Sequence, residues 1–447
     1  MYNMNQPHKK VYVVGAGLAG SECAFQLAER GYLVTLIEMR DQKMTPAHKT
    51  PLFAELVCSN SLGSTTEYSA PGQLKWEAER LNSLILKSAF EAQVPAGMAL
   101  GVDREIFSKN ITLALENHPN ITIERRTVHS LEEIPRPAVI ATGPLTDTAL
   151  AESMKEHFDD EFMYFFDAIA PIIDTDSINM DIAWKADRWG KGTNDYINCP
   201  LNKEQYYNLL NEIKVARKIE AKDFEKETPY FEGCMPIEAM LERGDETLRF
   251  GPLSPKGLTP PNCTERPYAV VQLRQENKEA TAYNMVGFQT KMAYGDQKRV
   301  FSMIPGLENA EFLKLGSIHR NLYIHSPKKL NKDLSSLKDP FLFFAGQITG
   351  VEGYFESTCI GLLVAMMLTD KIENREINFP PRKSAMGSLL NAITEEREHF
   401  QPTNINFSLL PPLEIPEGVK NKKIPKREKR DRMLVFAKKA FSEWLMK

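Results

Sequence analysis

Val11-Tyr12-Val13-Val14-Gly15-Ala16-Gly17-Leu18-Ala19-Gly20 is the stretch that decides the fold of this 447-residue chain. Its first four residues are apolar and mostly β-branched, which predicts a short buried strand. Gly15, Gly17 and Gly20 follow with G-x-G-x-x-G spacing, which allows a tight turn, close approach of the backbone to a pyrophosphate, and packing of the next helix on the sheet. Strand, glycine turn and helix in this order predict a dinucleotide site, with the helix N-terminus facing the phosphates.

The residues after the glycines complete this unit. Helical spacing predicts a helix from about residue 18 to residue 31, and residues 33–37 predict a second strand. Glu38 follows Gly20 by 18 residues, close to the roughly 20 expected for an acid that binds ribose hydroxyls. The segment therefore predicts a doubly wound α/β fold of the Rossmann type.

Composition excludes several classes of protein. Hydrophobic residues make up 42% and charged residues 26% of the chain, as in ordinary globular domains. The longest apolar run, 360–368, is far short of the ~20 residues of a membrane span, and the polar leader does not resemble a signal peptide, so we expect a cytoplasmic protein. Six scattered cysteines without a C-x-x-C pair predict free thiols and no metal site.

Charge is unevenly distributed along the chain. The formal net charge is −4, yet residues 420–432 contain eight basic residues against Glu428 and Asp431. Such a run can contact nucleic-acid phosphates, but more often it is a solvated helix face. A final amphipathic helix is expected to dock on the body through Met433, Ala437, Ala440, Phe441, Trp444 and Leu445.

The segment 39–64 predicts a long loop beside the cofactor, and such loops tend to be functional. It carries Thr45-Pro46-Ala47-His48 and then Cys58. Cys58 precedes three good N-cap residues, and a helix over 73–93 is expected beyond them. A thiolate stabilised by a helix N-terminus is one interpretation of Cys58, and a small core residue is the other.

The next segment completes the first part of the fold. Asp103 is expected to open a helix, and residues 121–123 and 139–144 predict further strands. The last strand ends at Gly143 in an Ala-Thr-Gly turn, which lies beside the cofactor in two-dinucleotide flavoproteins. We therefore expect an FAD-binding segment over residues 1–145.

The sequence pattern changes after residue 145, and this change predicts an inserted α+β domain over residues 146–335. Its β-rich runs alternate with turn residues and with short helices such as 203–214; the runs are 162–173, 248–250, 268–273 and 283–288. Cys234 lies in Phe231-Glu232-Gly233-Cys234-Met235-Pro236-Ile237-Glu238, where Pro236 is expected as the first residue of a helix over 237–242. As with Cys58, spacing alone leaves both the reactive and the core interpretation open.

The remaining residues, 336–447, predict the second part of the FAD-binding domain with a basic tail. The apolar run 340–347 indicates a strand that ends at Gly346 and Gln347. Gly350, Gly353 and Tyr354 then lead into a helix that continues to about residue 368. This helix N-terminus would supply the second end of an FAD site.

Together these motifs resemble one family, the folate- and FAD-dependent tRNA (uracil-5-)-methyltransferases (TrmFO), over essentially the whole chain. The markers are residues 15–20, 45–48, 54–62, 231–238, 267–275, 286–290 and 345–354. The resemblance implies bound FAD, NADPH or NADH as reductant, methylenetetrahydrofolate as carbon donor, and a T-loop uridine of tRNA as acceptor. Three positions depart from the expected pattern: Gly63 replaces a basic residue, Thr358-Cys359-Ile360 replaces small residues, and Gln347 stands where most two-dinucleotide flavoproteins have aspartate.

The resemblance also implies the site residues. Cys234 is assigned as the thiolate that adds to uracil carbon 6, and Cys58 as a second thiol or proton-transfer group near the flavin. Reduced flavin would deliver the hydride that completes the methyl group. The cofactor-binding residues it implies are Gly15, Ala16, Gly17, Leu18, Ala19, Gly20, Glu38, Gly143, Gly346, Gln347, Gly350, Gly353 and Tyr354.

Four alternatives stay open from the sequence. The same chemistry could act on a uridine of ribosomal RNA. An MnmG-like wobble-uridine enzyme shares the glycine motifs, but it is much longer and has a partner-binding helical domain. For the present chain we expect no stable protein partner. A flavin disulfide reductase needs a closely spaced cysteine pair, which this sequence lacks. A non-catalytic flavin-dependent RNA-binding protein would keep FAD and function without Cys58 and Cys234.

Overall fold

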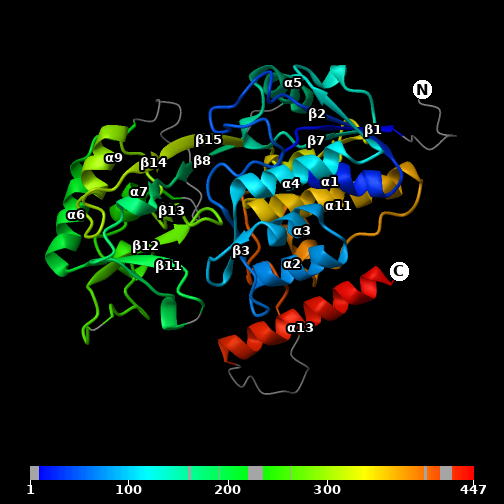
Figure 1. The fold of residues 1–447 in the computed structure, drawn as a ribbon. Coiled ribbons are helices and arrows are strands. Elements are labelled where there is room, and N and C mark those ends of the chain that lie inside the picture. The colour runs from blue at the N-terminus through cyan, green and yellow to red at the C-terminus, as the bar shows by residue number, and fades with distance from the viewer. Residues whose placement is uncertain are drawn as a thin grey trace.

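Five parallel strands form the central sheet of the larger lobe, at the right in Figure 1. The computed structural model describes residues 10–159, 163–190, 192–219, 235–261, 263–396, 400–412 and 425–446. The strand order is β16-β7-β1-β2-β6, which places the glycine-bearing strand at the centre. The bounds are β1 Lys10–Val14, β2 Leu33–Glu38, β6 Ile121–Arg125, β7 Ala138–Ile140 and β16 Leu342–Phe344. This sheet confirms the predicted doubly wound α/β fold.

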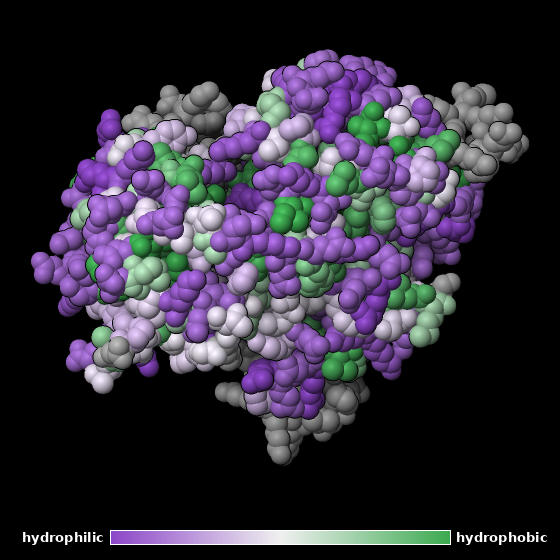
Figure 2. Space-filling view, in the orientation of Figure 1, coloured by the Kyte–Doolittle hydropathy of each residue, from purple (hydrophilic) through white to green (hydrophobic). Residues whose placement is uncertain are grey.

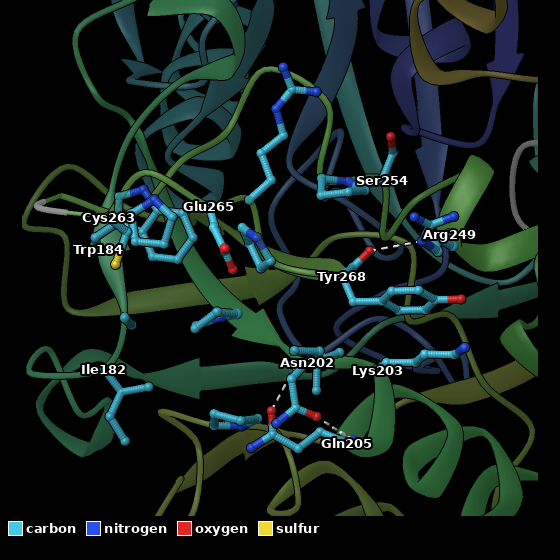
Figure 3. Close-up of a pocket in the computed structure, with 18 of the residues that line it drawn as sticks. Ile182, Trp184, Asn202, Lys203, Gln205, Arg249, Ser254, Cys263, Glu265 and Tyr268 are labelled. Carbon is cyan, nitrogen blue, oxygen red and sulfur yellow. Dashed lines mark hydrogen bonds between the residues drawn. The ribbon is translucent and has the colours of Figure 1, made fainter.

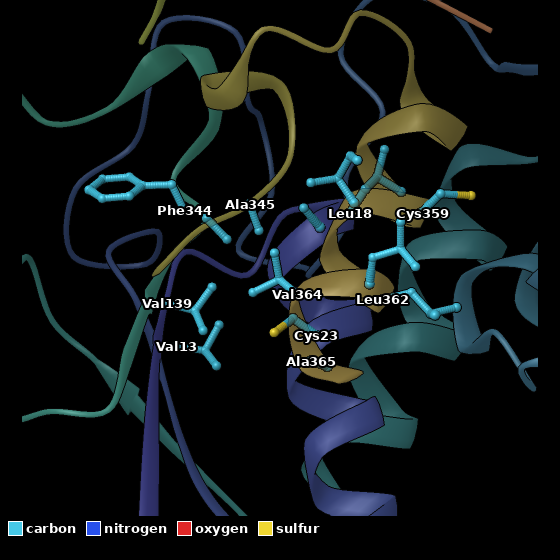
Figure 4. Close-up of a cluster of buried hydrophobic side chains, with 14 of the residues drawn as sticks. Val13, Leu18, Cys23, Val139, Phe344, Ala345, Cys359, Leu362, Val364 and Ala365 are labelled. Carbon is cyan, nitrogen blue, oxygen red and sulfur yellow. The ribbon is translucent and has the colours of Figure 1, made fainter. Parts of the chain in front are cut away.

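Two long helices, α1 (Leu18–Glu29) and α11 (Tyr354–Ile372), pack side by side against this sheet (Figure 1). Their close approach requires Gly361, because a Cβ there would lie 2.2 Å from the carbonyl oxygen of Ala19. Cys23 and Cys359 are fully buried among these helices and the sheet residues (Figure 4). Burial raises the pKa of both thiols well above the ordinary range, so these two cysteines are core residues.

Further helices and a small sheet complete this lobe. A three-stranded sheet in the order β3-β5-β4 lies beside the first helices. The bounds are α2 Ala70–Arg80, α3 Leu84–Glu91, α4 Arg104–Glu116, α5 Thr148–Phe158, α10 Ser326–Lys329, α12 Ala385–Thr394, β3 Ser61–Ser64, β4 Gln93–Val94 and β5 Ala99–Val102. Asp103 caps α4 by accepting from the backbone of Glu105 and Ile106, both at 3.0 Å, as its sequence position predicts.

The second lobe, at the left in Figure 1, is built on a six-stranded antiparallel sheet in the order β10-β11-β12-β13-β9-β14. One face of the sheet is apolar and contributes Leu273, Tyr283 and Met285 to a separate core. The opposite face carries polar side chains. The elements are β9 Ile172–Asp174, β10 Trp184–Lys185, β11 Tyr196–Leu201, β12 Ala269–Gln275, β13 Ala282–Met285, β14 Phe312–Lys314, α6 Lys203–Val215, α7 Ile237–Glu242, α8 Thr247–Phe250 and α9 Tyr294–Phe301.

An antiparallel ribbon of β8 (Met163–Ile169) and β15 (Ser317–Tyr323) carries the chain into and out of this second lobe. At the other end of the molecule, α13 (Lys426–Leu445) runs along α2 (Figure 1), and Phe441 packs edge-on against Trp76. The predicted docking of this helix is confirmed, although Leu445 is exposed.

The outer surface is mixed in character. Figure 2 shows hydrophobic residues scattered among polar ones on the face that it presents. Across the ranges described above, no helix combines the length and the apolar composition of a membrane span.

The predicted helix over 73–93 is wrong, because the chain forms two helices there. Asn82 adopts a left-handed φ of 55° and ends the first helix. Ser83 then caps α3 by accepting from the backbone of Leu86, and the buried Glu22 carboxylate accepts from Ile85 N–H at 2.9 Å. A local cap from Ser83 and a distant one from Glu22 of α1 therefore prevail over a continuous helical hydrophobic pattern.

Two further local predictions in the second lobe need correction. The run 248–250 forms the short helix α8 rather than a strand, because the backbone N–H of Arg249 donates to the Tyr206 hydroxyl and its side chain to the carbonyl of Tyr268. Pro236 is the N-cap of α7 and not its first residue. The other predicted β-rich runs of this lobe contain strands β8, β9, β12 and β13.

Candidate functional site

A cavity opens at the carboxyl ends of the parallel strands, where the fold places cofactors. The predicted cofactor residues that line it are Gly15, Gly17, Leu18, Ala19, Glu38, Gly143, Gly346, Gln347 and Tyr354. Ala16, Gly20 and Gly350 stand outside this lining, and Gly353 lines a neighbouring cavity. Gly350 instead packs so close to Phe400 that a Cβ would lie 2.4 Å from its ring.

The three fingerprint glycines differ in the space around them. A Cβ on Gly20 would lie 1.8 Å from the Gly15 carbonyl oxygen, so Gly20 serves helix packing. Gly15 has a φ of 96°, which favours glycine. A Cβ on Gly17 would meet nothing within 4 Å. Open space at Gly17 beside the N-terminus of α1 fits the pyrophosphate of a dinucleotide.

Glu38 is held in place in the lining of this cavity. Its carboxylate accepts from Ala16 N–H at 2.7 Å and from the Arg40 backbone and guanidinium at 2.9 and 3.0 Å. Burial opposes its ionisation, but the Arg40 charge and these hydrogen bonds prevail and lower its pKa. An ionised carboxylate facing the cavity fits ribose hydroxyls, while Arg40 was not identified from the sequence.

His48 of the Thr45-to-His48 motif also lines this cavity. Its Nδ1 lies 2.6 Å from the Thr45 hydroxyl oxygen. Burial and the Arg40 charge lower the pKa of His48 to about 4. The imidazole is therefore neutral at physiological pH and offers a hydrogen bond without a charge.

A second cavity, of about 410 Å³, adjoins the first and contains Cys58. The two cavities share the lining residues Val57, Pro144, Leu145, Gln347 and Tyr354. The second cavity lies at the junction of the two lobes, because its lining continues through Ala170, Arg274, Asn284, Val286 and Asn321. A thiol and a dinucleotide cradle therefore lie on either side of one shared wall.

The backbone around Cys58 is fixed by two elements distant in sequence. Its N–H donates to the Tyr354 hydroxyl at 2.6 Å. Arg104 donates to the carbonyl of Leu56 at 2.7 Å and forms an ion pair with Glu276 at 2.9 Å. The predicted helix N-terminus at Cys58 is wrong, since the residues that follow enter strand β3 and Ser69 caps α2. Cys234, the other predicted catalytic residue, lies outside the described residues.

Lys75 is a buried cation in the wall of the second cavity. Its Nζ donates to the Leu62 carbonyl at 2.7 Å and lies 4.6 Å from the centre of the Phe355 ring. Burial lowers the pKa of Lys75 to about 8, although nearby Glu356 opposes this shift. Gly63 lies against this ammonium group, at 3.8 Å from its Cβ position. Lys75 thus places positive charge beside Gly63, the position where the resemblance leads us to expect a basic residue.

The inserted lobe contributes a polar wall that the sequence did not reveal. Arg274, Asn284, Gln289 and Asn321 line the second cavity from three separate segments. Arg274 and Asn284 are direct partners in the β12–β13 register and share the polar face of the sheet. The resemblance marked the segments 267–275 and 286–290, which contain Arg274 and Gln289, but only the strand pairing brings Arg274 beside Asn284.

A third, larger groove of about 1260 Å³ lies on the inserted lobe alone (Figure 3). Arg249 stacks over Tyr268 there, with 4.1 Å between the guanidinium carbon and the ring centre. None of the predicted site residues that the structure describes lines this groove. Within the basic run, Arg432 pairs with Glu428 at 2.6 Å and Arg430 lies over Phe407, while residues 420–424 lie outside the described residues.

Comparison with known proteins gives consistent results. A family profile described as glucose inhibited division protein A matches residues 10–376. The chain is 66% identical over 446 residues to methylenetetrahydrofolate–tRNA-(uracil-5-)-methyltransferase TrmFO of Bdellovibrio bacteriovorus, which covers 99% of this chain and 100% of that protein. It is 50% identical over 437 residues to the protein of the same name from Natranaerobius thermophilus, covering 98% and 99%.

Among solved structures, GidA of Aquifex aeolicus has the same fold. The superposition has a TM-score of 0.69 at 15% identity and covers 97% of this chain and 73% of that one.

Proposed function

The chain belongs to the TrmFO family of methylenetetrahydrofolate–tRNA-(uracil-5-)-methyltransferases, and from this premise we propose that it methylates carbon 5 of a uridine in tRNA. Methylenetetrahydrofolate supplies the carbon. The observation that carries the proposal is the shared wall between the dinucleotide cradle and the cavity of Cys58. A reaction that combines a redox cofactor with a thiol-activated base needs both sites within reach of one substrate.

FAD fits the first cavity. The residues that would hold it are Gly17 at the pyrophosphate, Glu38 at the ribose, and Gly143, Gly346 and Gln347 farther along the lining. Gln347 is held by its own hydrogen bond to Glu352 at 2.7 Å. FAD held there and reduced would supply the hydride that completes a methyl group. We propose a nicotinamide, NADPH or NADH, as the source of its electrons.

Thiol chemistry activates the base. Uracil carbon 5 becomes nucleophilic when a thiolate adds to carbon 6, because the S–C6 bond forms while the C5=C6 electron pair moves toward O4 as an enolate. We propose that Cys234 makes this addition and that Cys58 acts as the second thiol or proton-transfer group. Cys58 is partly accessible in its cavity, unlike the core cysteines Cys23, Cys199 and Cys359.

The finer assignments extend the same proposal. The target is the T-loop uridine, with a ribosomal RNA uridine as the competing substrate, and the enzyme acts in the cytoplasm without a stable protein partner. The division of the chain at residues 145 and 335 remains a prediction. The paired strands β8 and β15, which lie inside these boundaries, support it.

The test is a labelling assay with purified protein, isotopically labelled methylenetetrahydrofolate, NADPH, and unmodified tRNA and ribosomal RNA transcripts. Mass spectrometry of the digested RNA locates the label. Label in 5-methyluridine of the tRNA T-loop is expected. Label in ribosomal RNA alone would support the proposed reaction but would identify ribosomal RNA, and not tRNA, as the substrate. Absence of label from both, with FAD bound and reducible, would contradict the proposed activity.

A further inference from the structure

Asn284 is a buried residue in the wall of the Cys58 cavity, and its amide nitrogen has no partner among the described residues. The residue is 4% exposed and lines the cavity. Its Nδ2 has no hydrogen-bond partner in the part of the chain that the structure describes. Burying a donor without a partner is unfavourable, and native structures rarely retain one without a reason.

The amide is free to serve a ligand. An amide carries a donor and an acceptor side by side, so it can form a matched pair of hydrogen bonds with the edge of a base. The amide of Asn284 is therefore available to bind a ligand. Asn198, on the same face of the sheet, differs because its amide donates to the Trp184 carbonyl at 3.2 Å and to the Ala186 carbonyl at 2.9 Å.

Arg274 adds positive charge beside this amide. It lies directly opposite Asn284 in the strand register. Its Nε donates to Asn60 Oδ1 at 3.1 Å, and Asn60 is anchored by donating to the carbonyls of Val102 and Gln275 at 3.1 and 2.9 Å. Among the described residues, no carboxylate forms an ion pair with Arg274. The wall of the Cys58 cavity thus carries the amide of Asn284 beside the guanidinium of Arg274, which its hydrogen bond to Asn60 holds in place.

We propose that Asn284 binds the N3–O4 edge of the target uracil and selects uridine over cytidine, an inference that rests on the proposed function. Uracil presents an N–H beside the O4 carbonyl, which an amide matches with its acceptor and its donor. Cytosine presents an amino group at the O4 position and an unprotonated N3. An amide oriented for uracil would meet both groups as mismatches, and the cationic Arg274 beside it favours the O4 carbonyl over an amino group. Buried mismatches of this kind discriminate strongly.

The same contacts assist the reaction. Addition of a thiolate to carbon 6 places negative charge on O4, and a donor already directed at O4 stabilises that charge without reorganisation. The neighbouring guanidinium favours the same charge. The pterin ring of the folate also contains a carbonyl beside an N–H but does not become an enolate, so the cationic wall favours uracil as the ligand of Asn284.

The experiment compares three variants of the full-length, FAD-loaded enzyme on two tRNA transcripts that carry U or C at the target position. Asn284→Ala removes the amide, and Asn284→Asp keeps its shape but removes the donor at neutral pH. Asn277→Asp is the matched control on the β12–β13 connection, where the Asn277 side chain bonds Thr281 and lies outside the cavity lining. FAD absorbance and melting temperature establish that each variant is folded.

We expect Asn284→Ala to lower kcat/KM for the U transcript by roughly 100-fold with an unchanged KM for the folate. Asn284→Asp should lower the ratio of U to C methylation by at least about tenfold, while Asn277→Asp retains both values. Wild-type kcat/KM in a folded Asn284 variant would overturn the inference, as would a raised KM for the folate alone, which assigns the amide to the pterin. A wild-type enzyme that labels no uridine would instead overturn the proposed function itself.

Discussion

The hydroxyl of Tyr354 accepts a hydrogen bond from the backbone N–H of Cys58 at 2.6 Å, across 296 residues of sequence. Tyr354 is the first residue of α11 and lines both the dinucleotide cavity and the Cys58 cavity. The helix that closes the cofactor site therefore also fixes the loop that carries the thiol.

Tyr354→Phe should lower kcat by between roughly ten- and a hundredfold, because it removes the hydroxyl that accepts from the Cys58 N–H and so loosens the loop. The ring that lines both cavities stays, so bound FAD should remain stoichiometric by absorbance. Steady-state labelling of tRNA measures the effect. A variant with unchanged kcat would show that the loop needs no such anchor.

Replacement of Cys234 or Cys58 by alanine should abolish methyl transfer while FAD stays bound, because the base cannot be activated or completed without both thiols. Cys263→Ala is the matched control, since Cys263 is exposed in the groove of the inserted lobe and away from the Cys58 cavity. Full activity in Cys234→Ala would remove it as the nucleophile. Absence of methyl transfer from the wild type, with RNA binding unchanged in both variants, would favour a non-catalytic RNA-binding protein.

Gly17→Ala and Gly20→Ala should fail in different ways. The first adds a methyl group to open space, so the apoprotein should melt as the wild type does while FAD affinity falls by roughly tenfold or more. The second drives a Cβ to 1.8 Å from the Gly15 carbonyl and should lower the melting temperature of the apoprotein. Unimpaired FAD binding by Gly17→Ala would argue against a pyrophosphate at this position.

Glu77 predicts a pH-dependent stability. It is fully buried and accepts from the backbone N–H groups of Ala385 and Met386, both at 2.8 Å, at the start of α12. Burial raises its pKa from 4.5 to about 7. The protonated form is thus favoured in the folded state, so its contribution is complete below pH 4.5 and is lost as pH rises toward 7, by roughly 3 kcal/mol.

Urea unfolding at several pH values measures this contribution, with Glu77→Gln as the variant that keeps the shape and cannot ionise. The free energy of unfolding of Glu77→Gln relative to wild type should rise between pH 5 and pH 7. Glu77→Ala should be destabilised at every pH, because two helix N–H groups lose their acceptor. Parallel pH profiles for wild type and Glu77→Gln would exclude Glu77 as the titrating group.

The basic run makes a separate prediction about RNA. Neutralising Lys422, Lys423, Lys426 and Arg427 should weaken tRNA binding and flatten the dependence of its logarithm on salt concentration, if these groups contact phosphates. Titrations at several salt concentrations give the slope. An unchanged slope would identify the run as a solvated helix surface.

The sequence predicted features that depend on neighbours along the chain. The strand, glycine turn and helix at residues 11–31 follow directly from local pattern, and so does the Asp103 cap. The break at Asn82 was missed because Glu22, on another helix, caps the new N-terminus. A carboxylate so distant in sequence leaves no mark on the periodicity of residues 73–93.

The candidate site was predicted in part for the same reason. Its glycines and Cys58 lie in recognisable motifs, whereas Lys75, Arg274 and Asn284 reach the cavity only through tertiary packing. Arg274 and Asn284 meet through strand pairing, and Lys75 reaches the cavity wall from the middle of a helix. Convergence of this kind is a property of the folded chain and has no signature in any single segment.

The β8–β15 ribbon has a consequence for how such enzymes diversify. Its paired strands, from Ser317 opposite Ile169 to Tyr323 opposite Met163, bring the inserted segment in and out at one place. A module joined through adjacent ends can be exchanged without disturbing the host sheet. The host retains the cradle and Cys58, and the module brings Asn284 and Arg274. Replacement of this inserted segment alone would therefore give a flavoprotein a new substrate.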